Sequence, residues 1–142
     1  MLRRHVREEL KAFCKKNNFT YWTQKTKTPE EFRKILARSK VGISVGGGGF
    51  DTMRFWEILG NNCILMTENI DIFPSNSKAL DYRRVYQFNN LFDFRDQLEL
   101  IATLLKNGYD QESFQEEYQK ILNAHSSKAR VRTILRHCRL II

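Results

Sequence analysis

The amino-acid sequence predicts an α/β domain with a mostly parallel sheet flanked by helices. Short apolar segments of strand length alternate with segments whose apolar residues recur every three or four positions. Strands that alternate with helices form βαβ units, which place parallel strands in one layer and helices on both of its faces. A run of glycines follows one apolar segment, as expected where a parallel strand ends and a helix begins. The 142 residues predict a single domain, 1–142.

In the first part of the chain, local signals predict two helices and two strands. Leu2, Val6 and Leu10 lie along one stripe of the first helix. Thr28 is expected to cap the second helix, with Pro29 at its first position. The predicted elements are a helix at 2–16, an aromatic strand at 19–23, a helix at 29–38 and a strand at 40–45.

After the glycine run, the same signals predict a strand-rich stretch and then a helical carboxyl-terminal segment. Gly60 and Gly108 are expected to end helices, because glycine tolerates the left-handed conformation found there. The predicted elements are a helix at 51–59, a strand at 63–66, a loop or broken helix at 69–77, a strand at 85–88 and helices at 91–106, 111–124 and 127–139.

The order of the elements makes the predicted fold Rossmann-like, with one departure. Such domains usually open with a strand that becomes central in the sheet, whereas this chain opens with a helix. Either the sheet is short and differently arranged, or the first strand belongs to a missing part of a longer protein. The domain is therefore predicted to be incomplete.

The composition is basic, with 24 Lys and Arg against 16 Asp and Glu, a formal net charge of +8 and a pI of about 9.6. This balance favours polyanions such as nucleic acid, an anionic membrane surface or the phosphates of a small molecule. A basic protein with scattered lysines and arginines is the alternative. The amino terminus has no signal-peptide pattern and no apolar run is long enough to span a membrane. We therefore expect a soluble, cytoplasmic protein without a transmembrane segment.

The cysteines and histidines do not predict a metal site. Cys14, Cys63 and Cys138 are far apart and form no CxxC pair, so we expect buried thiols rather than zinc ligands or disulfides. The three histidines are isolated, and His125 is expected to lie at a helix end, where a cation is favoured. No metal or cofactor is predicted.

The glycine run, Gly46, Gly47, Gly48 and Gly49, predicts a phosphate site. Glycine lets the backbone approach a ligand closely, and the helix start near Asp51 and Thr52 adds unpaired amides and a positive dipole end. Asp51 is also expected to cap the helix and to compete for those amides. The run matches neither the Walker pattern nor a full GxGxxG motif, so a flexible loop is the alternative.

The helix behind the glycines adds a polar strip. Arg54 and Glu57 lie about 60° apart at 100° per residue, opposite an apolar face with Phe55 and Ile58. Arginine can bind a phosphate and glutamate can accept hydrogen bonds from sugar hydroxyls. The alternative is an ordinary i,i+3 ion pair.

Thr67 and Glu68 follow the next strand at the same sheet edge. They are predicted either to line the pocket or to form an ordinary loop at the end of the strand. Tyr21, Trp22 and the nearby lysines could form a nucleic-acid patch, although packing within a strand is favoured.

Residues 38–68 resemble the carboxyl-terminal half of GT-B glycosyltransferases, in particular the CgeB-like proteins and the "glycosyl transferases group 1" domains. These have an Arg-x-x-Glu helix, a glycine and a new apolar strand, as in Arg54-Phe-Trp-Glu57, Gly60 and Cys63-Ile-Leu-Met66. The resemblance is specific only across these residues, although it extends over nearly the whole chain.

The resemblance implies a nucleoside-diphosphate sugar as the donor, without a metal. Glu57 would hold the ribose hydroxyls, and Arg54 and the glycine amides would hold the diphosphate. Many relatives have a second glutamate eight positions earlier, where this chain has Gly49. The acceptor-binding lobe is absent, so the catalytic residues are unknown and transfer is expected only with such a lobe or partner chain.

The sequence is also consistent with two functions other than that of a transferase domain. One is a stand-alone basic α/β domain that binds nucleotides or RNA without catalysis. The other is a degenerate remnant that is kept for protein interaction.

Overall fold

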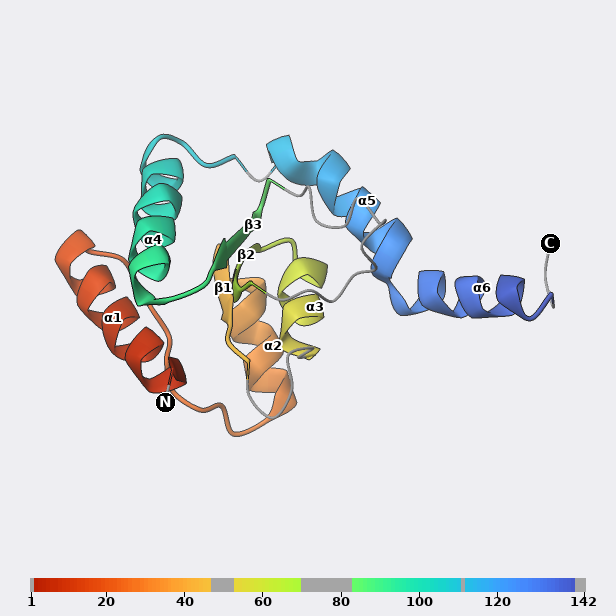
Figure 1. The fold of residues 1–142 in the computed structure, drawn as a ribbon, viewed down its shortest axis with the longest axis horizontal. Helices are drawn as coiled ribbons and strands as arrows, with labels where there is room; N and C mark the ends of the chain where they lie inside the picture. Colours follow the sequence, from red (N-terminus) through yellow and green to blue (C-terminus); the bar gives the residue numbers. More distant parts are fainter. Residues whose placement is uncertain (1, 47–52, 70–82, 111, 140–142) are drawn as a thin grey trace.

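The structure is a computed structural model, and it describes residues 2–46, 53–69, 83–110 and 112–139. Helices and strands alternate through its first half, and helices dominate the second half (Figure 1). The elements are α1 (Leu2–Asn17), α2 (Pro29–Ala37), β1 (Val41–Ser44), α3 (Met53–Gly60), β2 (Ile64–Glu68), β3 (Val85–Phe88), α4 (Leu91–Lys106), η1 (Glu112–Phe114), α5 (Gln115–His125) and α6 (Ser127–His137).

The three strands form one parallel sheet in the order β1-β2-β3. Val41 pairs with Ile64 at one end of the β1–β2 ladder, and Leu65 pairs with Val85 in the β2–β3 ladder. The parallel α/β prediction is therefore confirmed. β1 lies at the edge, and no strand in the described ranges pairs with its other side.

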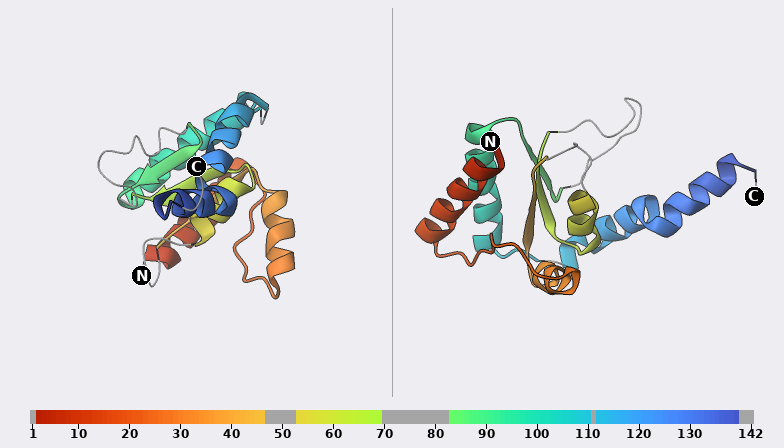
Figure 2. Two further views of the ribbon diagram at one scale, coloured as in Figure 1. Left: turned by 90° about the vertical axis from the view of Figure 1, so that its right-hand side faces the viewer. Right: turned by 90° about the horizontal axis from the view of Figure 1, so that it is seen from below.

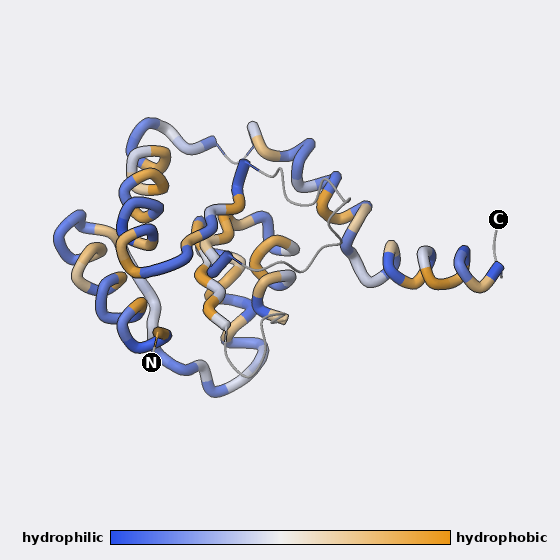
Figure 3. The backbone as a smooth tube through the Cα atoms, in the orientation of Figure 1, coloured by the Kyte–Doolittle hydropathy of each residue, from blue (hydrophilic) through white to orange (hydrophobic). Residues whose placement is uncertain are grey.

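Helices cover both faces of the sheet, because successive side chains of the central strand point in opposite directions. Ile64 and Met66 of β2 pack against α1 and α4, whereas Leu65 packs against α3 and α5. Figures 1 and 2 show α1 and α4 together on one side of the sheet and α2, α3 and α5 on the other. The hydropathy colouring in Figure 3 shows the apolar segments concentrated around the strands.

α3 approaches β1 very closely at Gly42. A Cβ atom built on Gly42 would lie 2.6 Å from Cγ1 of Ile58 and 2.8 Å from its other two outer carbons. Contacts of this length are not tolerated between carbon atoms. Glycine at position 42 therefore sets how close α3, which carries Arg54 and Glu57, lies to the sheet.

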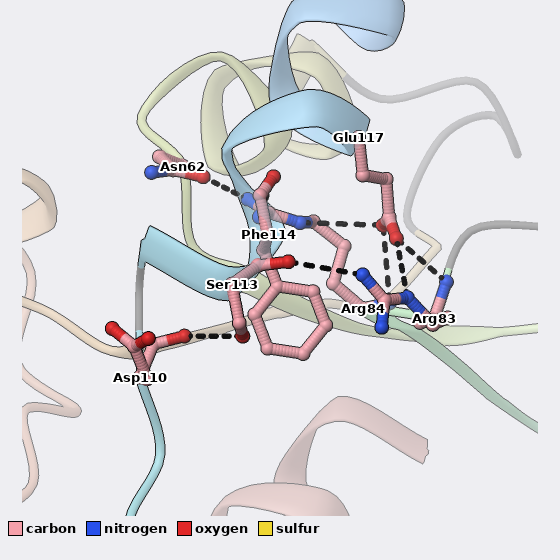
Figure 4. A network of polar contacts seen from close by, with 7 residues as sticks. All are labelled: Asn62, Arg83, Arg84, Asp110, Ser113, Phe114 and Glu117. Carbon is pink, nitrogen blue, oxygen red and sulfur yellow. Dashed lines mark hydrogen bonds and ion pairs between the residues drawn. The ribbon is translucent and has the colours of Figure 1, made fainter.

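A buried ion pair joins α5 to the amino edge of the sheet (Figure 4). Arg84 immediately precedes β3 and is 0% exposed. Its Nε lies 3.3 Å from Oε1 of Glu117 on α5, its Nη2 donates to the Phe114 carbonyl at 3.0 Å, and its Nη1 donates to Asn62. Backbone amides of Arg83 and Arg84 also donate to the Glu117 carboxylate, at 3.1 and 3.3 Å. This network fixes the helical carboxyl-terminal segment to the sheet.

The helix caps follow the sequence signals closely. Oγ1 of Thr28 accepts from the Glu31 amide at 3.1 Å, with Pro29 as the first residue of α2. Asn90 caps α4 by accepting from the amides of Phe92 and Asp93. The predicted bounds of β3 and α4 match those in the structure.

Two sequence predictions are wrong in the described residues. Residues 19–23 form no strand, and Trp22 is 51% exposed with its indole N–H donating to the Gln24 carbonyl at 3.0 Å. An aromatic segment without a neighbouring strand has no ladder to join. Cys138 is exposed, whereas Cys14 and Cys63 are buried as expected. The predicted loop at 69–77 lies outside the described residues except for Asn69.

α6 extends away from the rest of the molecule (Figures 1 and 2). None of its residues is buried, and its apolar side chains Val131 and Ile134 are 53% and 60% exposed. Within the described part of the chain, no helix has the length and apolar character needed to cross a membrane.

Candidate functional site

The carboxyl ends of the three strands are joined by hydrogen bonds. The Gly46 amide, just after β1, donates to the carboxylate of Glu68 at the end of β2. The Asn69 amide then donates to the Phe88 carbonyl at 2.8 Å, and its side chain donates to Asn89 at 3.1 Å. In an open parallel sheet this edge is where ligands bind. The bonds therefore fix the backbone at the place where a ligand is expected.

The first two turns of α3 bring Arg54 and Glu57 to this edge. Phe55, Ile58 and Leu59 anchor the helix in the core with at most 1% exposure. The side chains of Arg54 and Glu57 remain 47% and 41% exposed, and Nε of Arg54 lies 3.9 Å from the Glu57 carboxylate. The two residues therefore form an exposed i,i+3 pair, which contributes little to stability and remains accessible to a ligand.

Phe32 of α2 supports the Arg54 side chain. The guanidinium carbon of Arg54 lies 3.7 Å from the centre of the Phe32 ring. Such stacking is worth about 0.5–1 kcal/mol at an exposed site and leaves the guanidinium edge free to donate. Arg54 is thus oriented by an aromatic ring as well as by Glu57.

Arg54 lines an open pocket of about 290 Å³ together with side chains of α1 and β1. Two more arginines, Arg3 and Arg7, line the same pocket from α1. The remaining lining residues are Val6, Leu10, Thr23, Ile43 and Val45. The pocket therefore combines a largely apolar floor with three guanidinium groups.

Arg3 is held in place by the end of β1. Its Nε and Nη2 donate to the Val45 carbonyl at 3.2 and 2.9 Å. Val6, one turn further along α1, is 4% exposed and packs against β2 and α4. The amino end of α1 is therefore attached to the sheet beside the glycine run.

The pocket is strongly positive, because none of its described lining residues is acidic. The carboxylate of Glu57, which is not a lining residue, lies 3.9 Å from Nε of Arg54. Three like charges in one pocket repel one another unless an anion is bound. The arrangement is suited to holding an anion rather than to acid–base chemistry.

The predicted site residues are divided between described and undescribed parts of the chain. Gly46, Arg54, Glu57 and Glu68 lie at the carboxyl edge, and Thr67 lies beneath it with 2% exposure. Gly47, Gly48, Gly49, Asp51 and Thr52 lie outside the described residues. The functional roles of all of these residues stay predictions.

Arg3, Arg7 and Thr23 were not predicted from the sequence to be site residues. The i,i+4 spacing of Arg3 and Arg7 was available as a signal that both lie on one helix face. Their position next to β1 depends on how α1 packs on the sheet, which no local pattern specifies. In the described ranges, no group of three His, Cys, Asp or Glu residues could hold a metal ion.

His125, at the end of α5, belongs to a separate aromatic cluster. Its ring lies 4.7 Å from the ring of Trp56 on α3, and Arg130 lies 4.4 Å above the same indole. Burial and the nearby Arg130 charge lower the pKa of His125. The cluster joins α5 and α6 to the helix that carries Arg54.

A protein-family model described as glycosyl transferase-like matches residues 3–136, which is nearly the whole chain. No curated protein and no solved structure matches the chain.

Proposed function

Because the chain belongs to the glycosyl transferase-like family, we propose that it binds the nucleoside-diphosphate-sugar donor of a glycosyl transfer reaction. The observation that carries the proposal is the set of arginines around one pocket at the carboxyl edge of the sheet. Arg54 contacts the diphosphate, and Glu57, one turn further along α3, accepts hydrogen bonds from the ribose hydroxyls. The GT-B likeness of the Arg54–Glu57 helix supports these roles.

The leaving diphosphate is stabilised without a metal ion in this proposal. The amides of Gly47, Gly48 and Gly49, the amino end of the following helix and the arginines supply the positive charge, whereas the Gly46 amide already donates to the Glu68 carboxylate. Charge stabilisation of this kind is most effective when the groups are already in place before the reaction. The attachment of Arg3 to Val45 and the stacking of Arg54 on Phe32 are consistent with such pre-organisation.

Transfer to an acceptor requires a second lobe or a partner chain in our proposal. A transferase has to hold donor and acceptor in near-attack geometry, and the described pocket lies on a single lobe. The chain is then the donor-binding half of a two-lobed enzyme and is inactive by itself. We place the protein in the cytoplasm, because a reducing compartment suits its buried free thiols, Cys14 and Cys63.

Nucleotide binding to the isolated chain tests the proposal. Uridine, adenosine and guanosine diphosphates are expected to raise the melting temperature more than the corresponding monophosphates, because the site addresses two phosphates. The measurement is a thermal-shift series followed by calorimetry. Equal shifts for diphosphates and monophosphates, or no binding at millimolar concentration, would contradict a donor site.

The substitution Glu57→Gln tests the ribose contact. It is expected to weaken nucleoside-diphosphate binding by about 1–2 kcal/mol, the scale of a hydrogen bond to a charged group, with little change in stability because Glu57 is 41% exposed. Glu30→Gln is the matched control, since Glu30 forms an equally local ion pair with Arg33 on α2. A Glu57→Gln protein that binds normally but melts early would make Glu57 a structural residue.

The net charge of +8 also favours a second function, binding of RNA without catalysis. Salt titration separates the two functions. RNA binding that is tighter than nucleotide binding and falls steeply with salt would favour the second function.

A further inference from the structure

α1 contributes two arginines that neither the motif nor the family match assigns to a role. Arg3 and Arg7 are one helical turn apart and line the same pocket as Arg54 of α3. These residues are separated by about fifty positions in the sequence and approach one another only because α1 packs beside the end of β1. Arginines from two helices, α1 and α3, therefore line one pocket.

The surroundings of these arginines differ from those of their neighbours. Arg4, between them in sequence, points elsewhere and forms an ion pair with Glu8 at 3.0 Å. Arg3 binds only a backbone carbonyl, and Arg7 has no carboxylate partner in the part of the chain that the structure describes. Among the described residues, the two α1 arginines that line the pocket thus lack the carboxylate partner that Arg4 has.

The geometry of Arg3 makes it a fixed donor. Two of its N–H groups donate to the Val45 carbonyl, which restricts the guanidinium, and its remaining donors have no acceptor among the residues that the structure describes. A guanidinium that is already oriented loses less freedom on binding a phosphate than a free one. The apolar floor formed by Val6, Ile43 and Val45 excludes water on one side and strengthens the attraction.

We propose that Arg3 and Arg7 of α1 form, together with Arg54 of α3, a binding site for two adjacent phosphate groups. Three guanidinium groups match the charge of a pyrophosphate better than that of a single phosphate, and arginine binds phosphate oxygens in a bidentate manner. Within the proposed function, Arg54 and the α1 arginines together hold the diphosphate of the donor. The identification of the ligand as a nucleoside diphosphate rests on the proposed function. The binding of pyrophosphate at these arginines does not depend on it.

Calorimetry with inorganic pyrophosphate and inorganic phosphate tests the site on the full chain. Pyrophosphate is expected to bind more tightly than phosphate. Arg7→Gln is expected to weaken pyrophosphate binding about tenfold, the effect of losing a charge-assisted hydrogen bond. Arg4→Gln removes the same charge from the same helix and is expected to change the affinity less than about twofold, because it removes only a screened, exposed charge.

Arg7 is exposed, so Arg7→Gln is expected to fold and melt like the wild type. Arg7→Lys keeps the positive charge but lacks the planar guanidinium that donates two parallel hydrogen bonds. Its affinity for pyrophosphate is expected to lie between those of Arg7→Gln and the wild type. Equal losses in Arg7→Gln and Arg4→Gln would overturn the inference, since only the general field would then attract the anion. Equal binding of phosphate and pyrophosphate, or no pyrophosphate binding at millimolar concentration, would also overturn it.

Glu57→Gln separates this inference from the proposed function. It is expected to weaken nucleoside-diphosphate binding but not pyrophosphate binding, because pyrophosphate has no ribose and the loss of the Glu57 charge beside Arg54 does not disfavour an anion. If pyrophosphate binding depends on Arg7 but no nucleotide binds more tightly than pyrophosphate, the anion site stands and the donor function fails. If nucleoside diphosphates bind but Arg7→Gln behaves like Arg4→Gln, the donor function stands and the α1 site fails.

Discussion

At the amino edge of the sheet, Arg84 is 0% exposed and contacts the carboxylate of Glu117, whereas Arg3, Arg7 and Arg54 are exposed around one pocket at the carboxyl edge. Arginine side chains therefore occur in two different environments within one small domain. At the amino edge its donors are used by protein acceptors, so it contributes to holding α5 in place. At the carboxyl edge, several guanidinium donors have no acceptor among the described residues, which suits them to bind an anion. An arginine's role is decided by the acceptors that the fold supplies.

The largest expected effect follows from removing the charge of Glu117. Glu117→Gln leaves Arg84 as a buried cation without a counter-charge, which is expected to lower the free energy of unfolding by about 3 kcal/mol or more. Urea unfolding measures the loss. Glu116→Gln, at the exposed neighbouring position of α5, is expected to change stability by less than about 0.5 kcal/mol. A loss below about 1 kcal/mol in Glu117→Gln would remove the contrast between the two edges.

Removing both members of the pair is expected to cost much less than removing one. Arg84→Met with Glu117→Leu replaces the buried charges by apolar side chains and is expected to recover at least about half of the lost stability. The same urea unfolding series provides the comparison. Further destabilisation in the double variant would mean that the hydrogen bonds to Asn62 and Phe114 matter more than the ion pair.

A carboxylate introduced into the pocket is expected to make the carboxyl edge resemble the amino edge. Thr23→Glu gives Arg3, Arg7 and Arg54 an acidic partner, which is expected to reduce pyrophosphate affinity about tenfold or more. Stability is expected to rise by only a few tenths of a kcal/mol, because the pair is exposed. Thr23→Gln has nearly the same size and is the control. Unchanged pyrophosphate binding in Thr23→Glu would place the anion outside this pocket.

The smallest expected effect concerns the third arginine environment, at Arg130, Trp56 and His125. The lowered pKa of His125 means that the unfolded chain binds a proton more readily than the folded one. Stability is therefore fully present above the unfolded pKa of about 6.5 and falls as the pH decreases below it. His125→Gln is expected to flatten the dependence of the unfolding free energy on pH between about 5 and 6.5. An unchanged slope in the variant would assign the pH dependence to other groups.

Local patterns predicted most of the secondary structure. The bounds of β3 and α4 were both correct, and those of α4 were predictable because a period-3.6 pattern begins directly after Asn90, which caps the helix. Residues 19–23 were predicted wrongly because a strand needs a neighbour, and aromatic residues alone do not supply one. Local signals are therefore reliable where a cap or a periodic face is present.

Contacts between distant residues were not predictable. Arg84 and Glu117 are 33 residues apart, and neither residue has a local feature that marks it as buried. Arg54 and Glu57 were identified because they belong to one helix and one motif. Arg3 and Arg7 were not predicted as site residues, since their place in the pocket results from the packing of α1 against the end of β1.

The close approach of α3 to β1 links two positions on different elements. An increase in side-chain volume at Gly42 requires a decrease at Ile58, or α3 moves outward and carries Arg54 and Glu57 with it. Gly42→Ala alone therefore displaces the site as well as disturbing the core. In Gly42→Ala with Ile58→Ala, the carbon added on β1 is offset by the carbons removed from α3. We expect the two positions to be inherited as a pair: a related chain with alanine at position 42 has a small residue at position 58.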